Sequence, residues 1–262
     1  MTLIVLLSPG GAPGVTTTAL ALARAWPRKV VVAECDRSGG TVLAGLWSGA
    51  APRDGSGLLR LVLDGQRHTP ADIASAIRDY LIPLDERADR WVLPGAADPV
   101  QSRQLASSWP ALAAGLAALD ADVIADAGRF DADLELNALL TAATVVVMVL
   151  RPVVRQIVAA RSRLVYLRRL RVPLGLATVG EGPFEGDGPR LAADALAAPL
   201  LFDLPDDGTC ARILSIGAVP PRGFACSPLM RAAEAAAQVL SQQPAEACLP
   251  AQADEYDIPS VR

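Results

Sequence analysis

The stretch SPGGAPGVTTTALALA, residues Ser8–Ala23, decides how the rest of the chain is interpreted. A short apolar run, Leu3–Leu7, precedes it, and an Ala/Leu-rich helical pattern continues from it to about Trp26. Strand, glycine-rich turn and helix in this order are typical of a phosphate-binding loop, where backbone N–H groups and the helix dipole favour an anion. Where such a loop carries Gly-Lys-Ser/Thr, this chain has Gly14-Val15-Thr16, so the loop lacks its lysine.

Length and composition predict one α/β domain. The 262 residues are 52% hydrophobic but only 4% aromatic, so Ala, Leu and Val must form most of the core. The net charge of −4 does not favour nucleic acid or an anionic membrane as a general partner. We expect the domain to span residues 1–242 and the polar, acidic, proline-containing segment 243–262 to be a disordered tail.

Several classes of protein are disfavoured by what the sequence contains. Its four cysteines form no Cys-x-x-Cys pair, as expected of incidental thiols in a reducing compartment. A single histidine, His68, argues against a His-centred triad or a His-rich metal site. Met1–Ala23 has no basic residue and its apolar run is broken by Pro and Gly, unlike a signal peptide, while Leu136–Leu150 is too short to span a bilayer. We therefore expect a cytoplasmic protein.

Short apolar runs alternate with Ala-rich stretches of helical length. Near-continuous runs of Val, Leu and Ile are typical of strands in a parallel sheet that is covered on both faces. The alternation predicts an α/β fold with a doubly wound, mostly parallel sheet, three layers (α/β/α), and a ligand site at the carboxyl ends of the strands. The expected strands are Leu3–Leu7, Val30–Glu34, Trp91–Leu93, Val123–Asp126, Thr144–Leu150, Leu174–Thr178 and Leu200–Phe202.

Helices are expected over Ala132–Ala143, Val154–Arg171 and Pro228 to about Gln242. Proline disrupts a helix interior, so we expect Pro110 to break or kink the helix predicted over Gln101–Leu119. The glycine-rich segment 39–57 is expected to be a mobile loop carrying a short helix near residue 46.

Three side chains have the chemistry of a nucleotide–Mg²⁺ site. Thr16 starts the first helix, Asp36 follows the second strand, and Asp126 ends a later strand two residues before Gly128. All three are at carboxyl ends of expected parallel strands, so they would converge on one edge of the sheet. Hydroxyl and carboxylate oxygens are suited to Mg²⁺, and a carboxylate can orient an attacking water. The alternative is that they only cap a helix and two turns.

On these motifs the chain resembles the MinD/ParA family of deviant-Walker-A ATPases, over nearly its whole length. The family loop K-G-G-x-G-K-[ST]-[ST] lies over Gly10–Thr17, and the family's D-x-D strand end matches Glu34–Asp36. The family's D-x-x-G switch motif resembles the neighbourhood of Asp126 and Gly128.

Two later segments extend the resemblance. TVVVMVLRP, Thr144–Pro152, resembles the family's V-x-x-P-E segment, and Leu200–Gly217 resembles its I-P-x-D region. The combination G-x-P-G-V-T-T-T also resembles an actinobacterial MinD-like branch, some of whose members accompany pilus or secretion ATPases.

The resemblance implies ATP and Mg²⁺ as cofactors, a face-to-face homodimer, and a positioning role with a partner from partitioning or secretion machinery. It implies that Asp36 orients the attacking water. It further implies that Mg²⁺ is held by Thr16, Asp36 and Asp126, and that phosphates are cradled by Gly10, Gly11, Ala12, Pro13, Gly14, Val15, Thr16 and Thr17.

The chain departs from the family at three places. Gly10 and Val15 replace the two family lysines, and no asparagine for adenine stands in GLATVGEGP, residues 175–183. A hydrogen bond to a charged group contributes roughly 1.5–3 kcal/mol, so one lost contact weakens binding roughly tenfold to a hundredfold. A cation that contacts the transferred phosphate raises the rate of turnover by a factor of about 10³–10⁵, so the loss of the lysines should slow hydrolysis more than it weakens binding.

A substitute cation must come from arginine. The single lysine, Lys29, starts the second strand, at the far edge of the sheet from the loop. Arg37, Arg129 and Arg151 are better placed, each near the end of a strand, and one could act as an arginine finger does. The alternative is that these arginines are solvated loop residues.

The arginine-rich segment and the C-terminus are the other candidate interaction surfaces. Arg151–Arg171 holds seven arginines, but at 100° per residue only Arg161 and Arg168 share a face, which favours a solvated helix over a non-specific DNA contact. The expected buried stripe of this helix is Ile157, Ala160, Leu164 and Leu167. The C-terminus has no basic amphipathic helix, so we expect no membrane anchor. A nucleotide-free scaffold and, less favoured, a metabolic P-loop enzyme are the alternatives to an ATP-dependent switch.

Overall fold

The computed structural model describes residues 1–11, 13–46, 57–64, 69–84, 89–130, 136–184 and 186–243. Ala12, His68, most of the loop expected before residue 57 and the expected tail from residue 244 onward lie outside these ranges.

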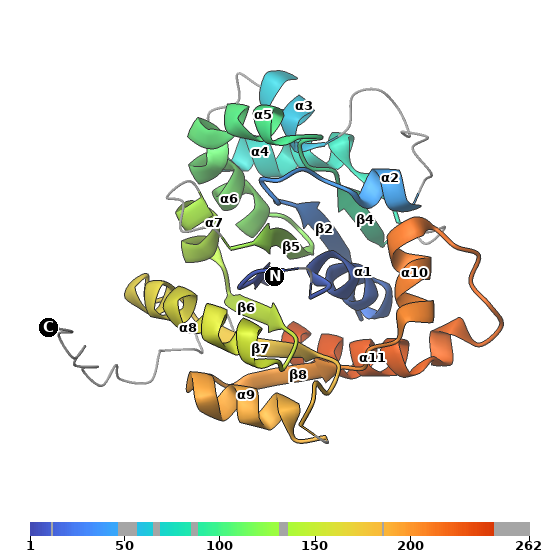
Figure 1. Cartoon of the computed structure of the whole chain (residues 1–262). Helices are drawn as coiled ribbons and strands as arrows, with labels where there is room; N and C mark the ends of the chain where they lie inside the picture. Colours follow the sequence, from blue (N-terminus) through green and yellow to red (C-terminus); the bar gives the residue numbers. More distant parts are fainter. Residues whose placement is uncertain are drawn as a thin grey trace, which may run out of the picture.

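A central sheet of eight strands has the order β3-β4-β2-β5-β1-β6-β7-β8 in the described part of the chain (Figure 1). Every neighbouring pair is parallel except β3 with β4, which is antiparallel. The seven expected strands are confirmed to within a few residues. The strands are β1 (Leu3–Ser8), β2 (Val30–Glu34), β3 (Ile82–Pro83), β4 (Arg90–Leu93), β5 (Asp122–Arg129), β6 (Val145–Leu150), β7 (Leu174–Val179) and β8 (Leu200–Leu204).

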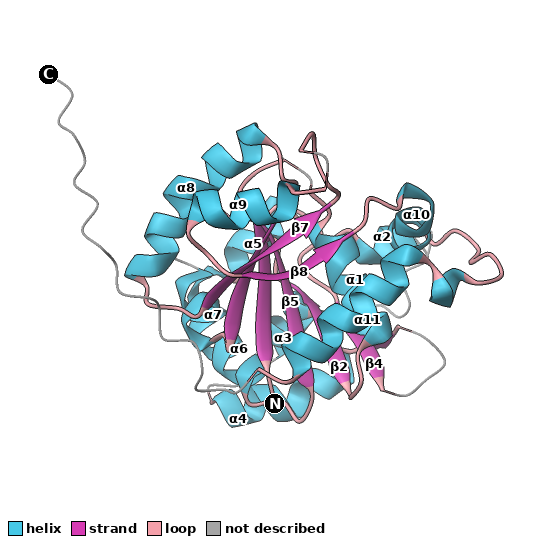
Figure 2. Cartoon of the chain, turned by 90° about the horizontal axis from the view of Figure 1, so that it is seen from below, coloured by secondary structure: helices cyan, strands magenta, loops and turns pink. Residues whose placement is uncertain are grey.

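The inner strands are apolar on both faces because both faces are covered. β1, β2 and β6 are buried at every residue, as the near-continuous Val/Leu/Ile runs predict. Helices lie on the two sides of the sheet, which confirms the three-layer, doubly wound α/β arrangement (Figure 2).

One helical layer packs through a core cluster that contains Ile4, Leu20 and Leu240. The other packs through a cluster that contains Val5, Leu112 and Leu164. The first layer holds α1 (Val15–Ala25), α2 (Val42–Leu46), α10 (Gly208–Ile216) and α11 (Pro228–Ser241). The second holds α3 (Leu58–Asp64), α4 (Pro70–Ile77), α5 (Pro99–Gln104), α6 (Trp109–Ala117), α7 (Asn137–Ala142), α8 (Val154–Arg169) and α9 (Gly188–Leu196).

The helix expected over residues 101–119 is two helices, and Pro110 does not act as expected. α5 ends at Gln104, a 3₁₀ turn covers Ala106–Ser108, and Pro110 lies in the first turn of α6. Proline is tolerated there because the first N–H groups of a helix have no partner within it. Pro110 therefore begins a helix, and the break falls before it. No helix in the described ranges is long and apolar enough to cross a membrane.

Candidate functional site

The glycine-rich segment forms the turn between β1 and α1. Gly10, Gly11 and Gly14 have φ of 154°, 72° and 100°, backbone conformations that glycine adopts without a Cβ penalty. Gly14 is the N-cap of α1 and makes no side-chain capping bond. The first N–H groups of α1 are therefore left for an anion, which the helix dipole also favours.

Val15, at the position of the missing lysine, belongs to the hydrophobic core. Its side chain is only 6% exposed and clusters with β1 and α1 residues such as Ile4 and Ala19. This position therefore contributes packing in place of charge.

Asp126 and Thr16 meet at the start of α1. Asp126 lies within the buried part of β5 and is 2% exposed. It accepts a hydrogen bond from the Thr16 hydroxyl and another from the Gly128 N–H at 3.0 Å. The pKa of Asp126 is raised to about 6, mainly by burial and to a smaller extent by the nearby carboxylates of Asp36 and Glu34, while the two hydrogen bonds lower it in part. The structure thus places a buried carboxylate and a hydroxyl together beside the glycine loop.

Asp36 lies against the turn that follows Asp126. Its carboxylate accepts hydrogen bonds from the N–H and hydroxyl of Ser38, at 2.8 and 2.7 Å. A Cβ on Gly128, whose φ is 59°, would lie 1.9 Å from Asp36 Oδ2, so any larger residue there would have to displace the Asp36 carboxylate. Within the described residues, no three His, Cys, Asp or Glu side chains form a metal-binding cluster, so a metal site would also need Thr16 or water.

Glu34 is a site residue that we did not predict. It is 4% exposed and its carboxylate accepts N–H hydrogen bonds from Thr41 at 2.8 Å, Val42 at 2.9 Å and Gly95 at 3.2 Å. Burial raises its pKa despite these bonds. Glu34 thereby joins the loops that follow β2 and β4. The signal in the sequence that could have identified it is an acidic residue at the end of an otherwise apolar strand.

A cavity of about 140 Å³ opens beside the loop. Pro13, Gly14 and Thr17 line it from the loop and the first turn of α1, and Leu229 lines it from α11. The remaining walls come from the ends of β6, β7 and β8 and from α10, and include Arg151, Val179, Leu204, Asp206 and Ala211.

Among the candidate arginines, the structure favours Arg151. It lines this cavity, whereas Arg37 and Arg129 are not among its described lining residues, and Arg129 is exposed at the end of β5. Lys29 lies at the opposite edge of the sheet, as expected.

Gln156 is a second residue that we did not predict. It is 4% exposed, and its Oε1 accepts a hydrogen bond from the backbone N–H of Arg151 at 2.7 Å. Its Nε2 lies 3.4 Å from where a Cβ on Gly11 would stand. The buried stripe of α8 contains Gln156, Ala160 and Leu164 at spacings of four, while the expected Ile157 is only partly buried. A polar side chain in register with an apolar stripe was the available clue.

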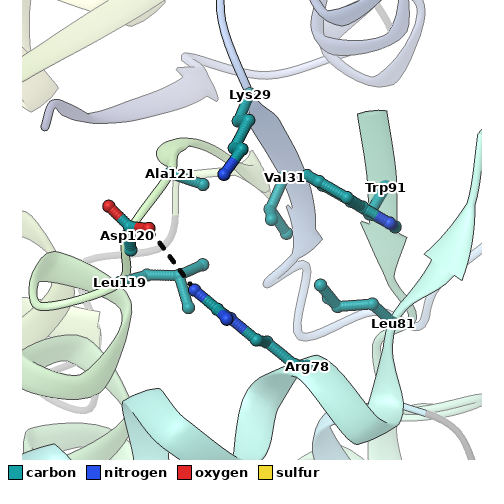
Figure 3. A pocket seen from close by; sticks show the side chains of 8 residues that line it. All are labelled: Lys29, Val31, Arg78, Leu81, Trp91, Leu119, Asp120 and Ala121. Carbon is teal, nitrogen blue, oxygen red and sulfur yellow. Dashed lines mark hydrogen bonds and ion pairs between the residues drawn. The ribbon is translucent and has the colours of Figure 1, made fainter. Parts of the chain in front are cut away.

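A larger cavity, about 240 Å³, lies at the other edge of the sheet (Figure 3). Lys29, Arg78 and Asp120 surround it with apolar residues such as Trp91, and Arg78 pairs with Asp120 at 3.4 Å. We assign the site to the smaller cavity because the glycine loop, the α1 N-terminus and Asp126 are at that edge.

A glycine loop between β1 and α1, at the carboxyl edge of a doubly wound parallel sheet, defines the P-loop class of α/β fold. No protein-family model and no curated protein matches the sequence. Solved structures of MinD and ParA-family ATPases share the fold at identities below 20%.

Three of these structures illustrate the likeness. The septum site-determining protein MinD with Mg-ADP from Pyrococcus horikoshii is 19% identical over 92% of this chain and 96% of that one, with a TM-score of 0.66. The ParA family ATPase from Chlorobium tepidum is 11% identical over 90% and 98%, with a TM-score of 0.68. A Cyanothece McdA variant in complex with ATP is 16% identical over 92% and 96%, with a TM-score of 0.66. The chain therefore has the fold of the MinD/ParA ATPases.

Proposed function

We propose that this protein is a MinD/ParA-like, nucleotide-dependent dimerising switch that takes part in positioning or partitioning within the cell. The observation that carries the proposal is the pairing of buried Asp126 with the Thr16 hydroxyl beside the glycine loop. A buried carboxylate whose pKa is raised by burial is destabilising by itself, and such groups cluster at functional sites.

The residues present fit ATP and Mg²⁺. The loop from Gly10 to Thr17, with Ala12 outside the described residues, offers N–H groups to phosphate at the uncapped start of α1. Thr16 and Asp126 would hold Mg²⁺, with Asp36 beside them as a third oxygen donor or as the group that orients water. Bound Mg²⁺ would supply charge neutralisation on the phosphates.

Because Val15 replaces the lysine, binding is expected to be weaker than in an intact P-loop by roughly tenfold to a hundredfold. Turnover would suffer more than binding, so the switch would depend on nucleotide occupancy more than on fast hydrolysis.

The proposed partners are a second copy of the chain and a protein of the partitioning or secretion machinery. Non-specific DNA is a weaker proposal, since Arg168 of α8 already donates to the Leu196 and Ala197 carbonyls at 2.8 and 2.7 Å. Arg163 likewise donates to the Ala159 carbonyl at 2.9 Å.

Calorimetric titration of ATP–Mg²⁺ tests the proposal, with light scattering to follow dimer formation. We expect binding by the wild type, and weakened or lost binding by Thr16→Ala and Asp126→Ala. Thr141→Ala and Asp120→Ala are matched controls, because both side chains are exposed and lie away from the loop. Absence of binding in the wild type, or equal binding by all variants, would overturn the assignment.

A nucleotide-free scaffold is the second candidate. It is favoured by the burial of Val15 in the core, which leaves the loop without the family cation. In that case the wild type gives no heat with ATP–Mg²⁺, and Thr16→Ala retains whatever partner contacts the fold provides.

A further inference from the structure

The glycine loop has no positively charged side chain, but the cavity beside it is lined by one. Of the described residues that line the 140 Å³ cavity, Arg151 is the one with a positively charged side chain. It shares the cavity with Gly14 and Thr17, at the start of α1.

The backbone of Arg151 is held close to the glycine loop. Arg151 follows β6, and the glycine loop follows β1. These two strands are direct neighbours in the sheet. Gln156 joins the two segments, because its Oε1 accepts the Arg151 N–H and its Nε2 lies beside Gly11. Gln156 is buried, so this arrangement is fixed by packing as well as by the hydrogen bond.

The guanidinium of Arg151 already binds an anionic group, the carboxylate of Asp206. Nη1 donates to Oδ2 at 2.5 Å and Nη2 to Oδ1 at 3.3 Å, a two-point contact. The two side chains are 38% and 54% exposed, and ion pairs so open to water add little stability. A planar guanidinium fork recognises carboxylate and phosphate with the same geometry, so one anion can replace the other.

We propose that Arg151 is the cation that binds the phosphate chain of a nucleotide at this loop, and that Asp206 occupies its guanidinium until phosphate displaces the carboxylate. This inference rests on the proposed nucleotide-dependent function. In this proposal, Arg151, which follows β6, supplies the positive charge that a lysine on α1 supplies in an intact P-loop.

The exchange would also reach α10. Asp206 adjoins Asp207, whose carboxylate accepts the Cys210 N–H at 3.0 Å and caps α10. A Cβ on Gly180, the residue after β7, would lie 3.2 Å from Asp206 Cβ, so the segment is closely packed on that side. The ion pair restrains this segment locally even though it adds little to the stability of the whole fold, so release of Asp206 would loosen the segment between β8 and α10 when nucleotide binds.

The test compares binding of ATP–Mg²⁺ and of inorganic triphosphate–Mg²⁺ by calorimetry in full-length variants. Arg151→Ala should weaken both ligands roughly tenfold or more, Arg151→Lys should lose less, and Asp206→Asn should tighten both severalfold. Arg155→Ala, an exposed arginine four residues along, should bind as the wild type does. Thermal melts of each variant establish that it folds.

Hydrogen exchange of the free proteins gives a readout without ligand. Arg151→Ala should speed amide exchange over residues 206–211 in the absence of nucleotide, and Asp206→Asn should do the same.

The outcomes separate this inference from the proposed function. Wild-type binding that is unchanged in Arg151→Ala overturns the inference and leaves the function standing. Weakening for ATP but not for triphosphate also overturns it, because Arg151 would then contact the base or sugar. Absence of binding in the wild type, Asp206→Asn and Arg155→Ala together overturns the proposed function itself.

Discussion

At the scale of single residues, the proposed phosphate site depends on Val15, which stands where the family loop carries a lysine. Val15→Lys should tighten ATP–Mg²⁺ roughly tenfold to a hundredfold, because a charge-assisted hydrogen bond contributes about 1.5–3 kcal/mol. Val15 is 6% exposed, so the substitution should also lower the free energy of unfolding by about 1.5–3 kcal/mol. Calorimetry and denaturant unfolding measure the two effects, and Val15→Leu is the control that adds no charge. Unchanged affinity in Val15→Lys would contradict the inherited geometry of the loop.

Gly128 determines the position of Asp36. Gly128→Ala places a Cβ 1.9 Å from Asp36 Oδ2 at a φ of 59°, so we expect Asp36 to be displaced and ATP–Mg²⁺ binding to weaken. The free energy of unfolding should fall by more than the roughly 1–2 kcal/mol that a left-handed backbone conformation costs a residue with a Cβ. Gly223→Ala is the control: its φ is 85°, and no atom lies within 4 Å of the added Cβ. Equal losses of stability in the two variants would mean that the contact with Asp36 is relieved without cost.

At this scale, part of the candidate site can be proposed from the sequence. The loop, Thr16 and Asp126 follow from local patterns, since each stands beside a recognisable strand or helix end. The pairing of Arg151 with Asp206 was not predicted, because it joins residues 55 apart through side-chain conformations that no local pattern specifies. Gln156 has a clue in its helical spacing, but its contact with Gly11 depends on β6 lying beside β1.

At the scale of elements, the burial of a strand or helix determines whether its position can be predicted from the sequence. Most of the seven parallel strands are apolar runs because both of their faces are covered, so the pattern of apolar runs along the sequence identified them. β3 was missed because it is two residues long, and one of these is a proline at the edge of the sheet. The division between α5 and α6 was misplaced because Pro110 begins a helix as readily as it breaks one.

The end of α9 offers a test of an element boundary. Ala197 caps the helix in the left-handed conformation, with φ of 47°, where glycine is preferred. Ala197→Gly should therefore raise the free energy of unfolding by about 0.5–1 kcal/mol, since glycine adopts that backbone without the Cβ penalty.

Ala195→Gly is the matched control, two residues earlier on the same helix and exposed. It should lower the free energy of unfolding by about 1 kcal/mol, as glycine does inside a helix. Denaturant unfolding of both variants measures the pair, and a loss of stability in Ala197→Gly would contradict the role given to its backbone conformation.

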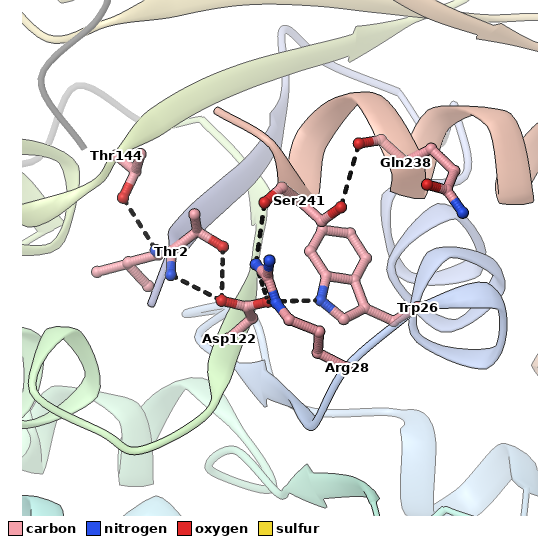
Figure 4. A network of polar contacts seen from close by, with 8 residues as sticks. Thr2, Trp26, Arg28, Asp122, Thr144, Gln238 and Ser241 are labelled. Carbon is pink, nitrogen blue, oxygen red and sulfur yellow. Dashed lines mark hydrogen bonds and ion pairs between the residues drawn. The ribbon is translucent and has the colours of Figure 1, made fainter. Parts of the chain in front are cut away.

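At the scale of the whole molecule, one buried carboxylate joins elements from both ends of the chain (Figure 4). Asp122, at the start of β5, accepts hydrogen bonds from the Thr2 N–H and hydroxyl at 2.8 and 3.0 Å and from Trp26 Nε1 at 2.8 Å. Arg28 Nη2 donates to Asp122 at 2.6 Å and to the Ser241 carbonyl of α11 at 2.9 Å. This network lies at the amino edge of the sheet, away from the glycine loop, so the carboxylate of the network differs from those of the proposed nucleotide site.

Burial by itself would raise the pKa of Asp122, but the hydrogen bonds from Trp26, Thr2 and Arg28 together lower it. A lowered carboxyl pKa in the folded state adds stability above the unfolded pKa of about 3.9, and this stability is lost as the pH falls through the folded pKa. Asp122→Asn should therefore lower the free energy of unfolding by about 1.5–3 kcal/mol at pH 7, the contribution of a hydrogen bond to a charged group.

The difference between wild type and Asp122→Asn should shrink as the pH falls below the unfolded pKa of about 3.9, and it should disappear only below the lowered folded pKa, where both proteins carry an uncharged side chain at this position. Asp120→Asn is the control. Its carboxylate is 65% exposed and meets Arg78 at 3.4 Å, and an ion pair so exposed contributes little. Denaturant unfolding between pH 3 and 8 measures all three proteins. ATP–Mg²⁺ binding by Asp122→Asn should match the wild type at temperatures where both are folded. A stability difference between the two proteins that stays constant with pH would show that the charge of Asp122 does not stabilise the network.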